Sequence, residues 1–238
     1  MTKNIAHWDA LADVFGQIGE TEEIPTYAAD NILIAWPSLL AGIDKVYLPP
    51  TTLAVLDYGC GGGLFCRKLH SLGHHTTGCD ISPKMMRAAQ HNMPSGVTLA
   101  DVEQALTIGA SYDLITSIMV LPFVEDLEEL LARLVKTLRP RGSIFFASFN
   151  PAFVHDNAGN DKPFTYTSQA DVGSMELKKG VKIPFYIRSA TGYQQAFAKF
   201  GMTEVYRDVP PFTPAFLEKY PFPLSTAHPE FLIMGFRA

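Results

Sequence analysis

The glycine-rich segment VLDYGCGGGLFCRKL, residues 55–69, constrains the fold of this 238-residue chain more than any other feature. An apolar run leads to Asp57, glycines follow at positions 59, 61, 62 and 63, and a helical pattern begins directly after them. Glycines let the backbone turn sharply and contact a ligand, and the free N–H groups of a helix start favour an anion. The segment therefore predicts a strand, a tight loop and a helix, with a polar or anionic ligand on the loop.

The pattern around this segment predicts a parallel sheet with crossover helices. Short β-branched apolar runs alternate with helical patterns as far as Asn150, which is typical of repeated strand–helix–strand units. Residues 1–50 favour helices, and the stretch after Asn150 favours a hairpin or lid. The expected strands are 52–59, 75–81, 97–102, 112–120, 142–150, 203–209 and 231–237, with helices at 127–138 and 192–200.

Composition excludes several classes of protein. The chain is 47% hydrophobic, 18% charged and carries a net charge of −5, so we expect a folded protein without the basic surface that nucleic acids need. The scattered residues Cys60, Cys66 and Cys79 indicate a reducing compartment and no metal site. The longest apolar run, 32–43, is shorter than the roughly 20 residues that span a bilayer. We expect a cytoplasmic protein with no membrane partner.

Two common nucleotide-binding patterns do not fit the glycine loop. The dinucleotide pattern G-x-G-x-x-G fails because Leu64 is the sixth residue counted from Gly59. The sequence G-x-x-x-x-G-K-[ST] of phosphate-binding loops does not occur, nor does a tyrosine four residues before a lysine, the active-site pattern of short-chain dehydrogenases. A nicotinamide enzyme is therefore not expected.

Four motifs in order resemble the class I S-adenosylmethionine-dependent methyltransferases, in particular their small-molecule, type 11-like branch. VLDYGCGGG resembles the first motif, TTGCDISPKMM (76–86) the second and LADV (99–102) the third. Residues 112–146 resemble the fourth motif with the helix and strand that follow it. The resemblance covers nearly the whole chain, because HWDALADVF and the last 50 residues also resemble the two ends of small-molecule members.

The resemblance implies a fold and a domain organisation. The expected fold is α/β, a Rossmann-like three-layer sandwich with a seven-stranded, mostly parallel sheet whose last strand is antiparallel. A single methyltransferase domain would occupy residues 1–238. It would comprise a helical cap (1–50), a cofactor-binding core (51–150), a substrate-side insertion with a β-hairpin or lid (151–191), and a last helix with a strand hairpin (192–238).

The resemblance also implies that S-adenosyl-L-methionine is the cofactor and S-adenosyl-L-homocysteine the product. Asp80 would accept both ribose hydroxyls, since one carboxylate can accept two neighbouring O–H donors. Asp101 would accept from the adenine amino group, and aromatic residues of the cap would close over the sulfonium. The implied cofactor-binding residues are Trp8, Tyr27, Asp57, Gly59, Cys60, Gly61, Asp80, Ile81, Met85, Asp101, Val102 and Ser117.

The substrate side departs from the family pattern. Many members carry a His pair just after strand four, whereas this chain has Pro122 and Phe123, which favours an apolar site. One of two histidines elsewhere, His155 or His228, is the candidate base that takes the substrate proton, and Arg188 would orient an acidic or carbonyl group. The candidate substrate-binding residues are Phe123, Phe149, Tyr186 and Arg188.

The sequence therefore predicts methyl transfer to an oxygen or nitrogen atom of a small, partly apolar or aromatic metabolite. Two alternatives stay open: a protein methyltransferase, and a non-catalytic module that binds the cofactor. A nucleic acid substrate is disfavoured, because residues 117–120 read SIMV where amino-methylating enzymes of nucleic acids carry an N-P-P-Y or D-P-P-Y sequence.

Overall fold

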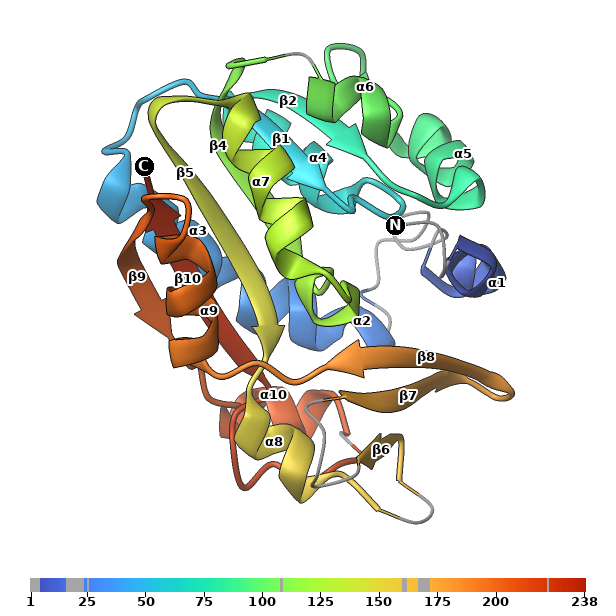
Figure 1. Cartoon of the computed structure of the whole chain (residues 1–238). Helices are drawn as coiled ribbons and strands as arrows, with labels where there is room; N and C mark the ends of the chain where they lie inside the picture. Colours follow the sequence, from blue (N-terminus) through green and yellow to red (C-terminus); the bar gives the residue numbers. More distant parts are fainter. Residues whose placement is uncertain are drawn as a thin grey trace.

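The computed structural model describes residues 5–15, 24, 26–107, 109–159, 162–166, 172–221 and 223–238. Its central sheet has the strand order β3-β2-β1-β4-β5-β10-β9 (Figure 1). β1 to β5 are parallel, whereas β10 is antiparallel to both β5 and β9. The predicted α/β fold class is confirmed. The strands are β1 (Ala54–Tyr58), β2 (His75–Cys79), β3 (Thr98–Leu99), β4 (Tyr112–Ile118), β5 (Leu138–Phe149), β9 (Thr203–Asp208) and β10 (Phe231–Arg237).

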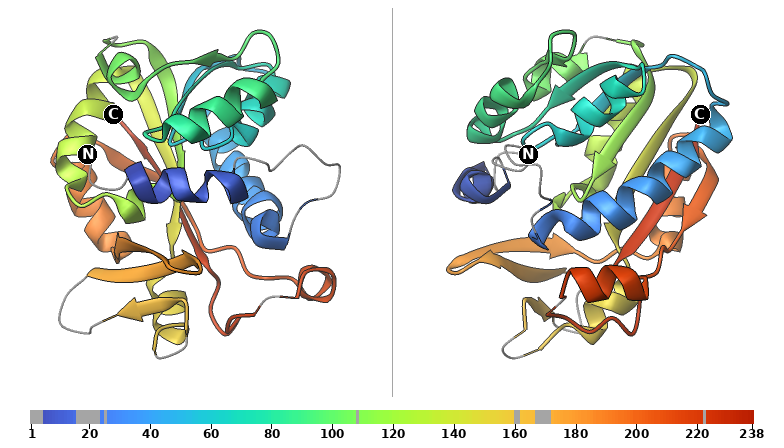
Figure 2. Two further views of the ribbon diagram at one scale, coloured as in Figure 1. Left: turned by 90° about the vertical axis from the view of Figure 1, so that its right-hand side faces the viewer. Right: turned by 180° about the vertical axis from the view of Figure 1, so that it is seen from behind.

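Helices cover both faces of this sheet (Figures 1 and 2). One face packs against α6 (Val102–Thr107), α7 (Leu127–Thr137) and α9 (Ala190–Ala198). The other face packs against α3 (Trp36–Val46) and α4 (Leu64–Ser71). The middle strands are buried on both sides, which explains why β1 and β5 read as continuous apolar runs instead of alternating ones.

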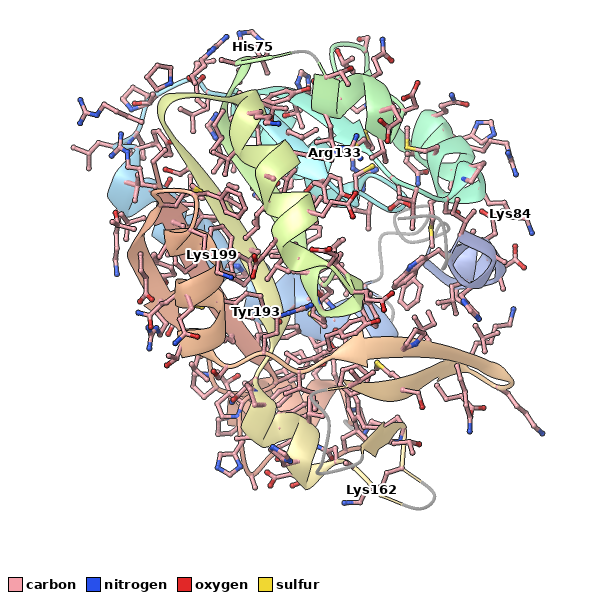
Figure 3. The ribbon with its side chains drawn as sticks, in the orientation of Figure 1. His75, Lys84, Arg133, Lys162, Tyr193 and Lys199 are labelled. Atoms are coloured by element: carbon pink, nitrogen blue, oxygen red, sulfur yellow. The ribbon has the colours of Figure 1, made fainter. Side chains whose placement is uncertain are left out.

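Exposed ion pairs join the helices of the first face (Figure 3). The Arg133 guanidinium on α7 lies 2.7 Å from the Glu103 carboxylate on α6, and the Lys199 ammonium at the end of α9 lies 2.5 Å from the Glu128 carboxylate. Pairs of this exposure stabilise a fold by at most about 1 kcal/mol each. The apolar stripe of α7, led by Leu130 and Leu134, therefore does most to hold this layer on the sheet.

The N-terminal cap forms the helices α1 (Ile5–Phe15), α2 (Thr26–Asp30) and α3, with a π-helical turn, η2 (Asn31–Ala35), between the last two. The Asp9 carboxylate on α1 accepts from the Ser82 hydroxyl and the Lys84 N–H at the start of α5 (Pro83–Asn92). Helix α1 is thereby fixed beside the carboxyl end of β2, so the cap reaches the edge of the sheet where the glycine loop lies.

The segment after β5 builds a small second sheet, where the sequence predicts a hairpin or lid. After α8 (Pro151–Asp156), strands β6 (Phe164–Tyr166), β7 (Val172–Lys178) and β8 (Val181–Tyr186) pair antiparallel in that order. The ring of Phe164 packs edge-to-face against Phe149 and Phe185, with centroids 5.3 and 5.6 Å apart. These aromatic contacts attach the second sheet to the end of β5. Helix α10 (Pro214–Lys219) lies in the Pro-rich loop before β10.

Several predicted boundaries differ from the structure: β3 spans only Thr98–Leu99 of the expected 97–102, α6 begins at Val102, and β5 begins early. We expected a break between helix 127–138 and a strand at 142, but β5 begins at Leu138, directly after α7. Leu138 already pairs with Tyr112 of β4, and Arg141 then adopts a positive φ of 64° where the register shifts. The helix therefore ends before Arg139 and Pro140, but the chain continues directly as a strand. Within the described part of the chain, no helix is long and apolar enough to cross a membrane.

Gly235 in β10 provides a test of the sheet packing. A Cβ on this residue would lie 2.4 Å from Cε1 of Phe145 on β5, closer than two carbons can approach. We expect Gly235→Ala to lower the free energy of unfolding by about 1–3 kcal/mol, because the ring must move within a close-packed core. Gly192→Ala is the control: its nearest atom is 3.6 Å away, and an alanine in α9 should stabilise by about 0.5–1 kcal/mol. Equal urea midpoints for both variants would contradict this packing.

Candidate functional site

A cavity of about 1070 Å³ lies at the carboxyl ends of the parallel strands. Open α/β sheets bind ligands at this edge, where the loops that follow the strands meet. The loops after β1, β2 and β4 form its floor, while α1, η2 and the β7–β8 hairpin contribute to its upper wall. Its volume is at the upper end of the range for small-molecule pockets, about 300–1,000 Å³, so it has room for two small ligands.

The glycine loop has the sharply turning backbone that its sequence predicts. Gly59, Gly61 and Gly63 have φ values of 77°, 54° and 82°, which side chains rarely allow. The N–H groups of Gly59 and Cys60 both donate to the Cys79 carbonyl, at 2.8 and 3.0 Å. The loop is thus fastened to the end of β2, and its turn is a fixed part of the cavity floor.

Asp80 fastens the same loop from its side chain. One carboxylate oxygen accepts from the Gly61 N–H at 3.0 Å, and the other accepts from the Ser82 N–H at 2.8 Å. Burial raises the pKa of Asp80, and these two N–H donors oppose that rise. Each carboxylate oxygen has a second lone pair, so Asp80, which lines the cavity, can still accept hydrogen bonds from a ligand.

Two glycines of the loop leave space for different purposes. A Cβ on Gly59 would lie 2.3 Å from Cγ2 of Val120, so this glycine lets the loop after β4 come close. Met119, just before Val120, has a positive φ of 55°, a strained conformation of the kind that gathers at ligand sites. By contrast, a Cβ on Gly61 would meet no atom within 4 Å. Gly61 therefore presents bare backbone to the cavity, where a ligand can approach closely.

Asp57 lies beneath the loop and is 2% exposed. Its carboxylate accepts from the Thr116 hydroxyl at 2.8 Å and from the Cys66 thiol at 3.4 Å. The pKa of Asp57 is raised to about 6, chiefly by burial. The two hydrogen bonds oppose this rise, and the nearby charge of Asp80 adds to it. Asp57 thus links the end of β1 to β4 and α4, and also reaches the cavity wall.

Aromatic side chains line the opposite wall. Trp8 of α1 meets Phe123 edge-on, with centroids 5.0 Å apart, and Phe123 meets Phe149 at 6.2 Å. Such contacts hold the cap helix against the loop after β4. Tyr186, at the end of β8, also faces the cavity. The structure therefore brings together most of the predicted residues in one cavity, namely Trp8, Asp57, Gly59, Cys60, Gly61, Asp80, Ile81, Met85, Val102, Phe123, Phe149 and Tyr186.

Three other predicted cofactor-binding residues are not among the described side chains that line this cavity. Asp101 caps α6, where its carboxylate accepts from the Gln104 N–H at 2.7 Å. Ser117 is completely buried under the floor, and its hydroxyl donates to the Tyr58 carbonyl at 3.1 Å. Tyr27 belongs to α2, but its side chain lies outside the described residues. The adenine contact expected of Asp101 would require its carboxylate to serve the helix cap and the ligand together.

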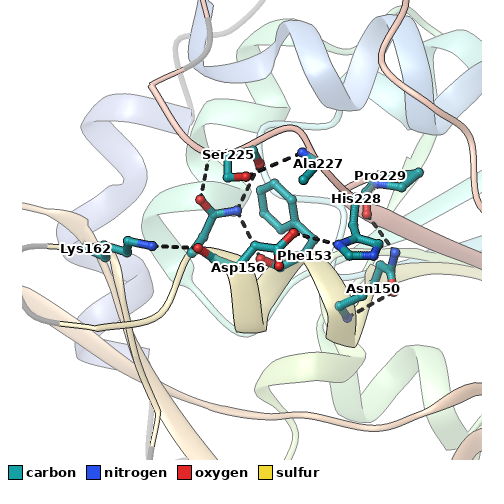
Figure 4. Close-up of polar contacts among 10 residues, drawn as sticks. Asn150, Phe153, Asp156, Lys162, Ser225, Ala227, His228 and Pro229 are labelled. Carbon is teal, nitrogen blue, oxygen red and sulfur yellow. Dashed lines mark hydrogen bonds and ion pairs between the residues drawn. The ribbon is translucent and has the colours of Figure 1, made fainter.

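The two candidate bases lie away from the cavity wall. His228 faces Asp156 of α8, with Nδ1 2.6 Å from the carboxylate, on the outer side of the Pro-rich loop (Figure 4). His155 lines a separate, shallow surface cavity beside Glu125 and Arg188. Neither histidine is among the residues that line the large cavity. The geometry therefore does not support either one as the base for a substrate bound there.

Arg188 makes structural contacts beside the cavity, and its predicted substrate contact stays a prediction. Its guanidinium donates to the carbonyls of Leu121, Val124 and Glu125, at 2.9, 2.6 and 3.1 Å, and stacks over the Tyr186 ring. These bonds hold the end of β8 against η3 (Leu121–Phe123), the turn that carries Phe123. Arg188 is a positioning residue for the aromatic wall.

An acidic pair that no sequence pattern predicts lies on the far side of the cavity. Asp30, at the end of α2, and Glu230, just before β10, both line it and are only 8% and 7% exposed. They are 200 positions apart, so no local spacing could reveal that they meet.

Part of the chain is similar in sequence to known methyltransferases. Residues 56–146 match the family model described as a methyltransferase domain. A ubiquinone biosynthesis O-methyltransferase of Bordetella avium is 30% identical over 137 residues, which are 55% of this chain and 54% of the relative. A similar enzyme of Chelativorans is 34% identical over 41% of each chain. The chain therefore spans about half the length, or less, of the curated relatives it matches.

Solved structures share the fold. An S-adenosylmethionine-dependent methyltransferase from Mesorhizobium loti superposes with a TM-score of 0.65 and 24% identity, covering 85% of this chain and 97% of that one. At this level of identity the likeness extends to the fold and no further. It agrees with the strand order and the antiparallel last strand described above.

The buried Asp57 predicts a pH effect on stability. The folded protein holds this proton more tightly than the unfolded chain, whose carboxyl has a pKa near 3.8. The stabilisation that protonated Asp57 gives the folded protein is complete below about pH 4 and is lost as the pH rises through about 6. Asp57→Asn cannot ionise. The difference between its free energy of unfolding and that of the wild type should therefore shift by about 1–3 kcal/mol in favour of the variant between pH 4 and pH 7. Urea unfolding at four pH values measures this, and a constant difference would contradict it.

Proposed function

We propose that this protein is a class I S-adenosylmethionine-dependent methyltransferase, since residues 56–146 match a methyltransferase domain model, and that its large cavity binds S-adenosyl-L-methionine and its methyl group goes to a small metabolite. The methyl acceptor is an oxygen or nitrogen atom of a partly apolar or aromatic molecule. The observation that carries the proposal is the junction of Gly61 and Asp80 at the carboxyl ends of β1 and β2, open to the cavity.

The residues present suit the cofactor. Bare backbone at Gly61 accommodates a ligand that lies against the loop, where a side chain would occupy the space. Asp80 keeps free lone pairs for two neighbouring hydroxyls, and Ile81, Met85 and Val102 supply apolar contacts beside it for a flat base. The cofactor supplies a methyl group already activated on a sulfonium, a cation that aromatic and carboxylate groups stabilise.

The chain's own residues then hold and shield the two reactants. In-line transfer needs the acceptor atom about 3–3.5 Å from the methyl group, in a site from which water is excluded. Trp8, Phe123 and Phe149 form a dry wall opposite the glycine loop, and Arg188 fixes the turn that carries Phe123. Orientation and desolvation are thus the contributions that this cavity offers most directly to the reaction.

The names of the relatives bear on the acceptor. The relatives from Bordetella avium and Chelativorans are called ubiquinone biosynthesis O-methyltransferases, which supports an oxygen acceptor on an aromatic ring. The residues that match the family model, 56–146, lie in the cofactor-binding core and end before the substrate-side segment. We therefore keep the proposal at a small apolar or aromatic metabolite and include both oxygen and nitrogen acceptors.

Calorimetry with S-adenosyl-L-methionine and S-adenosyl-L-homocysteine tests the proposal. Both should bind the wild type, and Asp80→Ala should weaken each by about 10- to 100-fold, since hydrogen bonds to a charged group contribute about 1.5–3 kcal/mol. Glu204→Ala, on the outer strand β9, is the control and should bind like the wild type.

Turnover is measured separately, as S-adenosyl-L-homocysteine formed with a panel of phenols and amines. No binding to the wild type at millimolar cofactor would overturn the proposal. Binding without turnover on any acceptor would favour a non-catalytic module, and turnover only with protein acceptors would favour a protein methyltransferase.

A further inference from the structure

The wall of the large cavity is strongly acidic and, among the residues that the structure describes, contains no lysine, arginine or histidine. A chain with a net charge of only −5 has thus gathered much of its negative charge around one cavity. Like charges in a partly enclosed space repel one another and attract cations from solution. The carboxylates that line the cavity are those of Asp30, Asp57, Asp80, Glu125, Asp126, Glu129, Glu176 and Glu230.

Two of these acids form a buried pair far from the glycine loop. The side chains of Asp30 and Glu230 lie close enough for their two carboxyl groups to interact. Burial and the neighbouring charge of Asp30 raise the pKa of Glu230 well above its usual range, and burial also raises the pKa of Asp30. Two carboxyl groups buried side by side are a costly arrangement without a counter-ion or hydrogen-bond donors.

Two oxygen acceptors at this place have no hydrogen-bond partner. They are Oε2 of Glu230 and Oδ1 of the neighbouring Asn31, and both atoms are buried. Each unpaired buried acceptor costs about 1–3 kcal/mol, so native structures rarely leave two together. Glu230 and Asn31 both line the cavity, which makes a ligand with two or more donor hydrogens the natural partner for them.

The backbone holds both acids firmly in place. The Glu230 carbonyl accepts from the Asn150 N–H at 2.7 Å, and the Asn150 side chain donates to the Pro229 carbonyl at 2.8 Å (Figure 4). Asp30 caps the π-helical turn η2, accepting from the Asn31 N–H at 2.7 Å. π-helical turns are rare and are frequent at functional sites. The pair is thus a preformed feature of the cavity wall, not a chance contact of flexible side chains.

The position of the pair fits the second ligand, not the cofactor. Glu230 precedes β10, and strands β4 and β5 separate β10 from β1. Since neighbouring strands lie about 4.8 Å apart, the pair is about 14 Å across the sheet edge from the strand that leads into the glycine loop. The floor between them is apolar, from Ile118 and Met119 to Phe149.

We propose that the Asp30–Glu230 pair, with Asn31, is a binding site for the protonated amine of the substrate, whose apolar body lies over Met119 and Phe149. This rests on the proposed methyl-transfer function and names its substrate class as amine-bearing metabolites. An ammonium group supplies both the positive charge that balances the pair and the several N–H donors that the unpaired oxygens need. A neutral alcohol supplies one donor and no charge, and a carboxylate would be repelled.

Calorimetry on the wild type, saturated with S-adenosyl-L-homocysteine, compares probes that differ only in one end group. The probes are 2-phenylethylamine with 2-phenylethanol, tyramine with 4-(2-hydroxyethyl)phenol, and hexylamine with 1-hexanol, together with 3-phenylpropionate. We expect at least one amine to bind tenfold or more tightly than its matched alcohol, and the carboxylate not to bind. If no amine shows this preference, the proposal is wrong.

Variants assign the preference to this pair. Glu230→Gln should reduce it to about twofold or less while the affinity for S-adenosyl-L-homocysteine stays within about twofold of the wild type. Glu176→Gln removes another carboxylate of the same wall, one that accepts from the Gly180 N–H, and should keep the preference. If thermal melting shows that Glu230→Gln is not folded, Asp30→Asn is used in its place. A tenfold preference that survives loss of the pair would overturn the assignment.

The cofactor and amine outcomes are separable. If S-adenosyl-L-homocysteine does not bind the wild type, the proposed function fails. The amine comparison without it still decides whether the acidic pair recognises an ammonium group.

Discussion

The tie between the glycine loop and the end of β2 is the interaction on which the rest of the site depends. The Asp80 carboxylate and the Cys79 carbonyl together accept from Gly61, Gly59 and Cys60, so the loop has little freedom. This tie also fixes the direction in which α4 leaves the loop, and α4 packs on the sheet through Phe65 and Leu69. A change at Asp80 would therefore act on loop geometry as well as on any ligand that it holds.

Around this fixed floor the chain builds its upper wall from distant segments. The cap helix α1 is bonded to the start of α5 through Asp9, and the β7–β8 hairpin is bonded to η3 through Arg188. Both links end at residues next to the cavity, so the packing of the cap and of the second sheet determines the shape of the substrate half. The large number of aromatic residues after Asn150 is used here, in contacts such as Phe149 with Phe164.

Local patterns in the sequence predicted the fold and the glycine loop well, because their signals are short. A strand, a glycine loop and a helix lie within 15 residues, and Asp80 follows its own strand directly. The substrate half was harder, since its polar residues act over long separations. The chemistry of His155, His228 and Arg188 makes them candidates for the substrate side, but their partners depend on tertiary packing. Asp156 is the partner of His228, and the carbonyls of Leu121, Val124 and Glu125 are those of Arg188. The pairing of Asp30 with Glu230 is likewise a product of the fold.

The central claim is that the Gly61–Asp80 junction holds the nucleoside part of S-adenosyl-L-methionine. A crystal structure of the protein with S-adenosyl-L-homocysteine tests it most directly. The account predicts both ribose hydroxyl oxygens within about 3.2 Å of the Asp80 carboxylate, with the adenine against Ile81 and Met85. Density for the ribose elsewhere in the cavity, with no contact to Asp80, would contradict it.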